Sequence, residues 1–356
     1  MTKNGIHHVT AITGPAPRNV DFYTRVFGLR LVKKTVNFDD PATYHFYYGD
    51  EIGQPGTILT FFPWEHVAPG RLGVGETQEI AFRVPEASIG YWMHRFVEKG
   101  VAHESVEKRF GETVLAFKDP DGMRLAVVAV PGIGNDPAWS GGAVPTEHAI
   151  RGFHSVGLLL RDAAPTGAIL TDVLGFSEVG REDSSIRFKA QGTEIGGIVD
   201  IRVAGDFPRG QQGGGSVHHV AFRAPDDEAQ FAMLRKLAEN HGIRTTDQKD
   251  RNYFRSLYFR EPGGVLFEIA TDIPGFAIDE PVASLGRSLK LPPQYEPQRK
   301  EIEAARRRTS CSSNTRICRV KRVARFRFAS AVRPSTFRTC SCVVFSGSIH
   351  HISGGK

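Results

Sequence analysis

Four stretches of this chain begin with the same pattern of hydrophobic and polar positions. Each opens with a short apolar or alternating run, which is typical of a strand with one buried face. A stretch with the apolar spacing of a helix follows each run, and further strand-like runs follow the helix. The predicted opening strands are 7–12, 79–84, 154–159 and 218–222, and the predicted helices are 19–27, 90–99, 167–174 and 227–241.

Turn signals support the same repeat. All four predicted helices end near a glycine, the residue that most often terminates a helix. Residues 119–126 and 261–268 also match one another, because both read as an acidic residue, a proline and a glycine that lead into a final strand. The chain therefore reads as four copies of one βαβββ unit. The glycines are Gly28, Gly100, Gly175 and Gly242.

This repeat predicts an α+β fold of four βαβββ modules paired into two domains with cupped mixed sheets. We expect a first module pair, a linker rich in Gly and Pro, a second module pair, and an extension that includes a short charged helix over 298–305. A basic tail completes the chain. The predicted boundaries are 5–131, 132–149, 150–275, 276–305 and 306–356.

The net charge of +6 is misleading about the body of the protein. Residues 306–356 carry 12 of the 45 Lys and Arg residues and none of the 39 Asp and Glu residues, so the rest of the chain has a net charge of −6. Nucleic acid is therefore not an expected partner of the body. We expect the tail to be disordered or foreign to the fold. A basic arm that binds nucleic acid or membrane is the alternative.

Cysteine usage excludes several kinds of chemistry from the predicted modules. All four cysteines lie in the tail, so the body has neither disulfides nor a cysteine nucleophile. Their spacing does not suit a structural zinc site. The sequence has no apolar run long enough for a membrane helix and no signal peptide, so we expect a cytoplasmic protein without a membrane partner. Homo-oligomer formation stays open. The cysteines are Cys311, Cys318, Cys340 and Cys342.

Two His-His-Val triplets begin the first and fourth modules, at His7-His8 and His218-His219. Successive strand residues face opposite sides, so we expect one histidine of each doublet to face inward and its neighbour to face away or toward the rim. Glu268 lies on the last apolar strand, where a carboxylate needs a partner. His8, His219 and Glu268 are therefore candidate metal ligands.

Two imidazoles and one carboxylate leave coordination positions open for a substrate and for oxygen, which suits non-haem Fe(II). The same ligands fit Mn(II), and they fit zinc less specifically. His154 begins the third module and is a competing ligand. We prefer His8, because its module repeats the full doublet while His154 is followed by Ser155.

Further polar residues precede Glu268 in the fourth module. Arg251 and Tyr258 can position a bound substrate, move a proton and stabilise negative charge on oxygen. The competing interpretation is that Tyr258 only packs within the sheet and that Arg251 is a surface charge. His45 lies in an aromatic strand, where packing is favoured over a pocket role.

The sequence resembles the vicinal oxygen chelate superfamily of glyoxalases, bleomycin resistance proteins and extradiol dioxygenases. Within it, the chain is similar to the ring-cleaving hydroquinone dioxygenases over residues 5–305. The resemblance implies βαβββ modules that hold a divalent metal in a cupped sheet. The most specific stretches are 5–14, 28–40, 55–64 and 289–295.

The resemblance assigns the metal to His8, His219 and Glu268, in a site built from the first and last modules. Catechol-cleaving members build their site from the third and fourth modules, which keeps His154 as the alternative. The resemblance also implies roles in the pocket for five residues, some of which would hold hydroxyl groups. These residues are His7, Thr10, His218, Arg251 and Tyr258.

We therefore expect a dioxygenase that uses Fe(II), or Mn(II), to insert both atoms of O2 into a hydroquinone-type aromatic diol. A catechol extradiol dioxygenase is one alternative. A glyoxalase-type isomerase or lyase is another, although that type usually adds carboxylate ligands. A metal-free binding protein is disfavoured, because it has no need of the histidine doublets.

Overall fold

Residues 4–304 are described by the structure, which is a computed structural model. They lie within one unit of the chain, Met1–Ser313. The predicted tail 306–356 and its four cysteines lie outside the described residues. Within the described range, no helix is both long and apolar enough to cross a membrane.

The first two modules each consist of a strand, a helix and three more strands. In the first module the helix continues into a short π-helical segment, η1. Its elements are β1 (Ile6–Thr13), α1 (Ala16–Asp21), η1 (Phe22–Val26), β2 (Arg30–Val36), β3 (Tyr44–Gly49) and β4 (Ile58–Pro63). The elements of the second module are β5 (Glu76–Pro85), η2 (Glu86–Ser88), α2 (Ile89–Lys99), β6 (Glu107–Arg109), β7 (Glu112–Lys118) and β8 (Arg124–Val130).

The third and fourth modules repeat this order after a connection that contains η3 (Thr146–His148). The elements of the third are β9 (Phe153–Leu160), α3 (Ala164–Asp172), β10 (Phe176–Glu182), β11 (Ser185–Ala190) and β12 (Ile198–Val203). Those of the fourth are β13 (Val217–Ala224), α4 (Asp227–His241), β14 (Lys249–Asp250), β15 (Arg255–Arg260) and β16 (Leu266–Thr271). The extension contains η4 (Phe276–Ile278), η5 (Val282–Ser284), η6 (Pro293–Gln298) and helical residues 299–304.

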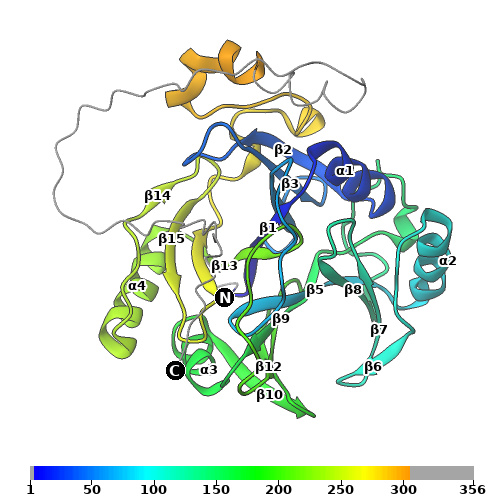
Figure 1. Ribbon diagram of the computed structural model, residues 1–356, viewed down its shortest axis with the longest axis vertical. Coiled ribbons are helices and arrows are strands. Elements are labelled where there is room, and N and C mark those ends of the chain that lie inside the picture. The colour runs from blue at the N-terminus through cyan, green and yellow to red at the C-terminus, as the bar shows by residue number, and fades with distance from the viewer. Residues whose placement is uncertain (1–3, 305–356) are drawn as a thin grey trace, which may run out of the picture. The chain divides into compact units, whose positions relative to one another are not determined.

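Two eight-stranded mixed sheets result, and both are curled (Figure 1). The first has the order β14-β15-β16-β13-β1-β4-β3-β2, and the second has the order β10-β11-β12-β9-β5-β8-β7-β6. The α+β fold of four βαβββ modules is therefore confirmed. Each sheet takes one module from residues 5–131 and one from residues 150–275, so the first and last modules share a sheet.

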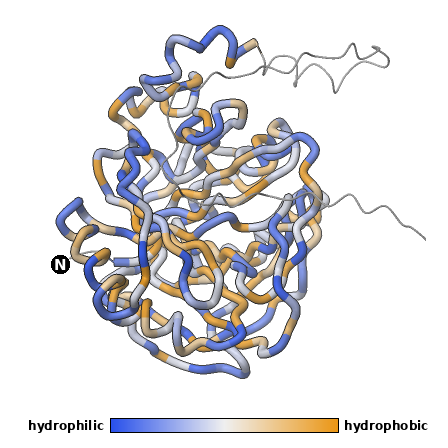
Figure 2. The backbone as a smooth tube through the Cα atoms, turned by 60° about the vertical axis from the view of Figure 1, so that its left-hand side comes forward, coloured by the Kyte–Doolittle hydropathy of each residue, from blue (hydrophilic) through white to orange (hydrophobic). Residues whose placement is uncertain are grey.

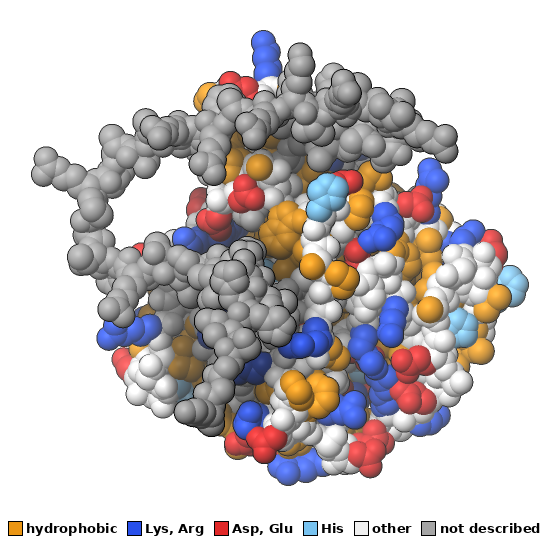
Figure 3. All heavy atoms as spheres, in the orientation of Figure 1, with side chains coloured by type: hydrophobic (Ala, Val, Ile, Leu, Met, Phe, Trp, Pro, Cys, Tyr) orange, Lys and Arg blue, Asp and Glu red, His pale blue; other side chains and the backbone are white. Residues whose placement is uncertain are grey.

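Apolar side chains from the strands and helices form the core. Trp92 and Phe96 of α2 are fully buried beside Phe27, Phe82 and Phe117. Hydrophobic segments gather in the interior of the fold, while hydrophilic segments lie on outer turns and helices (Figure 2). On the face drawn in Figure 3, acidic and basic side chains are interspersed. This mixture agrees with the modest net charge of the body.

The helix ends follow the glycine signals in the sequence. Gly100 and Gly242 end α2 and α4 with φ values of +66° and +63°. A residue with a side chain rarely adopts this left-handed conformation, so glycine ends the helix without strain. These two positions explain why the ends of α2 and α4 were readable from the sequence.

The matched acidic turns stabilise the start of a closing strand. The Asp119 carboxylate accepts hydrogen bonds from the backbone N–H groups of Asp121 and Met123, at 2.9 and 2.8 Å. The hydroxyl of Tyr23 donates to the same carboxylate at 2.9 Å. Glu261 plays the same part before β16. Each acidic residue therefore fixes the turn through which its module returns to the sheet.

Asp119 should give the protein a specific pH dependence of stability. Burial raises the pKa of this carboxyl from 3.8 to about 6, so the folded state binds the proton more tightly than the unfolded state. This contribution is complete below about pH 3.8 and is lost as the pH rises through about 6. Relative to Asp119→Asn, the wild type should lose up to about 3 kcal/mol of unfolding free energy between pH 4 and pH 7. Urea unfolding of both proteins across this range tests the prediction, and a pH-independent difference would contradict it.

Candidate active site

The first histidine doublet lies at an irregularity in the pairing of β1 with β13. Ile6 opposes Phe222, but His8 opposes Ala221, which is the next residue along β13, so His7 is an extra residue on β1. An extra residue of this kind is a β-bulge, and it breaks the alternation of faces along a strand. The rings of His7 and His8 consequently contact one another, with centroids 5.1 Å apart.

The second doublet repeats this geometry on the partner strand. Thr10 opposes His219 and Ala11 opposes Val217, so His218 is the extra residue on β13. The rings of His218 and His219 also have centroids 5.1 Å apart. Both doublets therefore lie at bulges, where the alternation of faces along a strand is interrupted.

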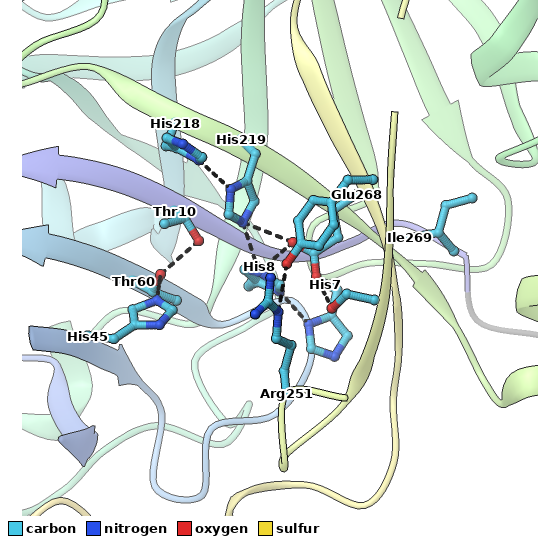
Figure 4. Close-up of polar contacts among 12 residues, drawn as sticks. His7, His8, Thr10, His45, Thr60, His218, His219, Arg251, Glu268 and Ile269 are labelled. Atoms are coloured by element: carbon cyan, nitrogen blue, oxygen red, sulfur yellow. Dashed lines mark hydrogen bonds and ion pairs between the residues drawn. The ribbon is translucent and has the colours of Figure 1, made fainter. Parts of the chain in front are cut away.

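His8, His219 and Glu268 converge on one point (Figure 4). The Nε2 atoms of the two histidines are 3.4 Å apart. Glu268 Oε2 lies 3.4 Å from Nε2 of His8 and 2.9 Å from Nε2 of His219. All three side chains are buried, and Glu268 is fully so. Glu268 reaches this point because β16 runs parallel to β13 and places the carboxylate opposite Ala221.

The pKa shifts of Glu268 and His219 suit the binding of a divalent metal. Glu268 Oε2 has no hydrogen-bond partner among the described residues, although Nε2 of His8 and Nε2 of His219 lie 3.4 and 2.9 Å from it. Burial raises the pKa of the Glu268 carboxyl, but the His8 and His219 rings outweigh burial and hold it well below its usual range. Burial lowers the pKa of His219. An ionised carboxylate and neutral imidazole are the forms that bind metal ions.

The first histidine of each doublet orients the second. Nδ1 of His8 lies 2.9 Å from Nδ1 of His7, and Nδ1 of His219 lies 2.8 Å from Nδ1 of His218. If Nε2 of His8 and His219 is the ligand atom, the ring proton is on Nδ1 and is donated to the neighbouring histidine. Such contacts fix the ring orientation of a metal ligand.

Burial keeps these outer histidines neutral. It lowers the pKa of His218 to about 3 and that of His7 well below its usual value. Nδ1 of each outer histidine can then accept a hydrogen bond from Nδ1 of the neighbouring histidine. The structure thus places the rings of His7 and His218 in contact with the rings of His8 and His219, respectively.

A cavity of about 350 Å³ opens beside the trio, and its lining is mostly apolar. Among the residues that the sequence predicted for the pocket, His218, Arg251 and Tyr258 line it, whereas His7 and Thr10 lie behind its wall. His45 lines it as well. The remaining lining residues are His8, Asn37, Phe38, Asp39, Tyr47, Phe62, Trp64, His219, Lys249, Phe254 and Leu266.

Arg251 and Tyr258 lie together at one wall of the cavity. Nε of Arg251 donates to the Tyr258 hydroxyl at 3.3 Å, and another guanidinium nitrogen donates to Asp39 at 2.9 Å. The Tyr258 ring packs edge-on against His219. Burial and the Glu268 charge raise the pKa of Tyr258, so its phenol is protonated at neutral pH. Tyr253 instead donates to Asp279 in the extension.

A hydrogen-bonded row of side chains crosses the opposite part of the sheet. Thr10 bonds Thr60 at 2.8 Å, and Thr60 bonds Nε2 of His45 at 2.8 Å. Nδ1 of His45 bonds the Tyr47 hydroxyl, also at 2.8 Å. Burial lowers the pKa of His45 well below its usual value, so the ring is neutral. The row places polar groups on β3, across the cavity from β15.

His154 lies in the other sheet, on β9. Its Nε2 is 3.0 Å from the carboxylate of Glu112, and its Nδ1 is 3.1 Å from the Ser155 hydroxyl. By register, Ser155 rather than His154 occupies the position equivalent to His219. The structure therefore brings His8, and not His154, to His219 and Glu268.

Several residues of the site gave no signal in the sequence. Ser256, Tyr47 and Asp39 contact the residues described above, yet each is an ordinary residue of a strand or loop. Tyr47 belongs to an aromatic run that also suits a sheet core. Only a three-dimensional arrangement distinguishes these side chains from structural ones.

A family model described as the Glyoxalase/Bleomycin resistance protein/Dioxygenase superfamily matches residues 5–127 and 152–269. These two stretches include the four βαβββ modules almost completely. The chain belongs to this superfamily. The resemblance noted in the sequence is thereby confirmed, and the superfamily fold accounts for the modular sheets.

The chain is similar to other members of the superfamily over most of its length. "Putative ring-cleaving dioxygenase MhqO" of Bacillus subtilis (strain 168) is 46% identical over 299 residues, which are 84% of this chain and 94% of that protein. "Chlorohydroquinone/hydroquinone 1,2-dioxygenase" of Sphingobium indicum is 33% identical over 303 residues, again 84% and 94%. The crystal structure of a "putative dioxygenase" from Bacillus subtilis has a TM-score of 0.80 at 44% identity, and covers 86% of this chain and 97% of that one.

Metal content of three variants tests the ligand assignment. We expect His8→Ala and Glu268→Ala to lose stoichiometric iron while they keep the fold, because each removes one of three ligands from an already folded site. His154→Ala should retain iron, since His154 lies in the second sheet. Iron analysis after anaerobic loading with Fe(II), together with circular dichroism, gives both readouts. Iron loss in His154→Ala but not in His8→Ala would contradict the assignment.

Proposed function

We propose that this protein is a ring-cleaving dioxygenase that inserts both atoms of O2 into a hydroquinone-type aromatic diol at a mononuclear Fe(II) site. The observation that carries the proposal is the buried trio of His8, His219 and Glu268 at the base of an apolar cavity. The names of the relatives at 46% and 33% identity support the same reaction class.

Fe(II) suits this trio because two imidazoles and one carboxylate leave several coordination positions for other molecules. When bound, Fe(II) supplies the electron transfer that allows O2 to react with an aromatic ring. The same donors accept Mn(II), which is the alternative metal. Most of the surface that the cavity exposes is apolar, with Phe38, Phe62, Trp64, Phe254 and Leu266 among its lining residues, so it can hold an aromatic ring.

Arg251 and Tyr258 are suited to hold charge and protons on the substrate. The Arg251 guanidinium stabilises negative charge on a substrate oxygen, because it lines the cavity and stays cationic. Tyr258 keeps its proton at neutral pH and can donate it to an oxygen that becomes negative. Its edge-on contact with the His219 ring places this phenol beside the metal trio.

Polar groups on two facing walls favour a diol whose hydroxyls lie at opposite ends of the ring. Tyr258 and Arg251 lie at the β15 wall, and the Tyr47 hydroxyl and His45 lie on β3. A hydroquinone has its two hydroxyls in this arrangement, whereas a catechol has both on one side. We therefore favour a hydroquinone, with one hydroxyl near the metal and the other near Tyr47.

Oxygen uptake distinguishes the candidate reactions. Protein loaded anaerobically with Fe(II) should consume O2 in step with the loss of methylhydroquinone, and more slowly with catechol. The same measurement on Mn(II)-loaded protein shows which of the two metals supports the reaction. A preference for catechol would assign the protein to the catechol-cleaving branch. Absence of uptake with either diol, despite stoichiometric iron, would instead favour an isomerase or lyase of glyoxalase type.

Replacement of Tyr47 by phenylalanine tests which diol the cavity recognises. We expect Tyr47→Phe to raise KM for methylhydroquinone about 10-fold, because one hydrogen bond to the second hydroxyl is lost. The KM for catechol should change little, since catechol does not reach β3. Steady-state oxygen uptake with both diols measures this selectivity. Equal changes for the two substrates would rule out a specific contact between Tyr47 and the second hydroxyl.

A further inference from the structure

Ser256 contacts the carboxylate of the proposed metal site from behind. It lies on β15, is fully buried, and has its Oγ 2.5 Å from Oε1 of Glu268. The strand pairing explains this contact, because Tyr258 opposes Glu268 and Ser256 is the next residue of β15 on the same face. A carboxylate can only accept, so the Ser256 hydroxyl is the donor.

This hydrogen bond makes the two oxygens of Glu268 different. Oε1 is occupied by Ser256, while Oε2 points between His8 and His219 and has no hydrogen-bond partner among the described residues. A free carboxylate can bind a metal through one oxygen or through both. The hydrogen bond from Ser256 competes with a metal for Oε1, so Oε2 is the favoured ligand atom.

We propose that Ser256 is a positioning residue that restricts Glu268 to one-oxygen coordination and so keeps a coordination position free for substrate or O2. The inference rests on the proposed function, because it requires that the trio bind a metal. It extends that proposal by assigning the number of open positions to a residue that does not touch the metal. A buried serine that only fills space would have no such effect on coordination.

Cobalt(II) provides a probe of coordination that is independent of turnover. The visible absorption of Co(II) weakens when its coordination number rises, so a change from one carboxylate oxygen to two is visible in the spectrum. The experiment compares the full-length wild type, Ser256→Ala and Ser256→Thr. Ser88→Ala is the matched control, because Ser88 is also a fully buried hydrogen-bonding serine but lies in the second module.

We expect Ser256→Ala to bind Co(II) 10- to 100-fold more weakly, which is the usual effect of losing a group that orients a metal ligand. Its visible absorption should also be weaker than that of the wild type. Ser256→Thr keeps the hydroxyl and should restore both the affinity and the spectrum. Ser88→Ala should match the wild type in both, even if its thermal stability falls.

The outcomes separate this inference from the proposed function. If the wild type and Ser256→Ala have the same Co(II) affinity and spectrum, the role of Ser256 is wrong, although the metal site stands. If the wild type binds no Co(II), both proposals fail. If circular dichroism shows that Ser256→Ala is unfolded, Ser256→Thr decides the question. A Co(II) spectrum of Ser256→Thr like that of the wild type supports the role of Ser256. A weaker absorption, as expected when both oxygens of Glu268 bind the metal, overturns it.

Discussion

The antiparallel pairing of β1 with β13 is the constraint on which the candidate active site depends. This pairing joins the first module to the last, and its two bulges lie at the histidine doublets, whose second members, His8 and His219, line the same cavity. Without the bulges, His7 and His218 would lie on the far face and could not orient their neighbours. The position of Glu268 follows as well, because β16 is aligned on β13. One strand pair thus sets the positions of all three proposed ligands.

In the second sheet, the same strand arrangement carries side chains other than the proposed metal ligands. Asp200 opposes Gly157 on β9, just as Glu268 opposes Ala221 on β13. In Asp200, however, both carboxylate oxygens accept hydrogen bonds from the Arg187 guanidinium at 2.8 Å. Arg187 also pairs with Glu112. A protein cation therefore neutralises this carboxylate, whereas one oxygen of Glu268 has no hydrogen-bond partner within residues 4–304.

The modules were predictable from the sequence because strand alternation, helix spacing and the terminal glycines are local signals. The three proposed ligands were identifiable because a doubled histidine is rare and a carboxylate such as Glu268 is unusual in an apolar strand. The prediction that the first and last modules form one site came from the family resemblance, because local patterns do not specify which strands pair. The contacts of Ser256 and Tyr47 were not predictable, because a hydroxyl on a strand acquires its partner only when distant strands meet.

The location of the proposed ligands at opposite ends of the modular region has a consequence for biosynthesis. A ribosome makes His8 before the rest of the four modules and Glu268 only after almost all of them are complete. The second sheet, whose strands come from the middle of the chain, can assemble while β13 to β16 are still being made. The nascent protein therefore has no complete ligand set until its fourth module has emerged and paired with β1, so metal capture is confined to the last stage of folding.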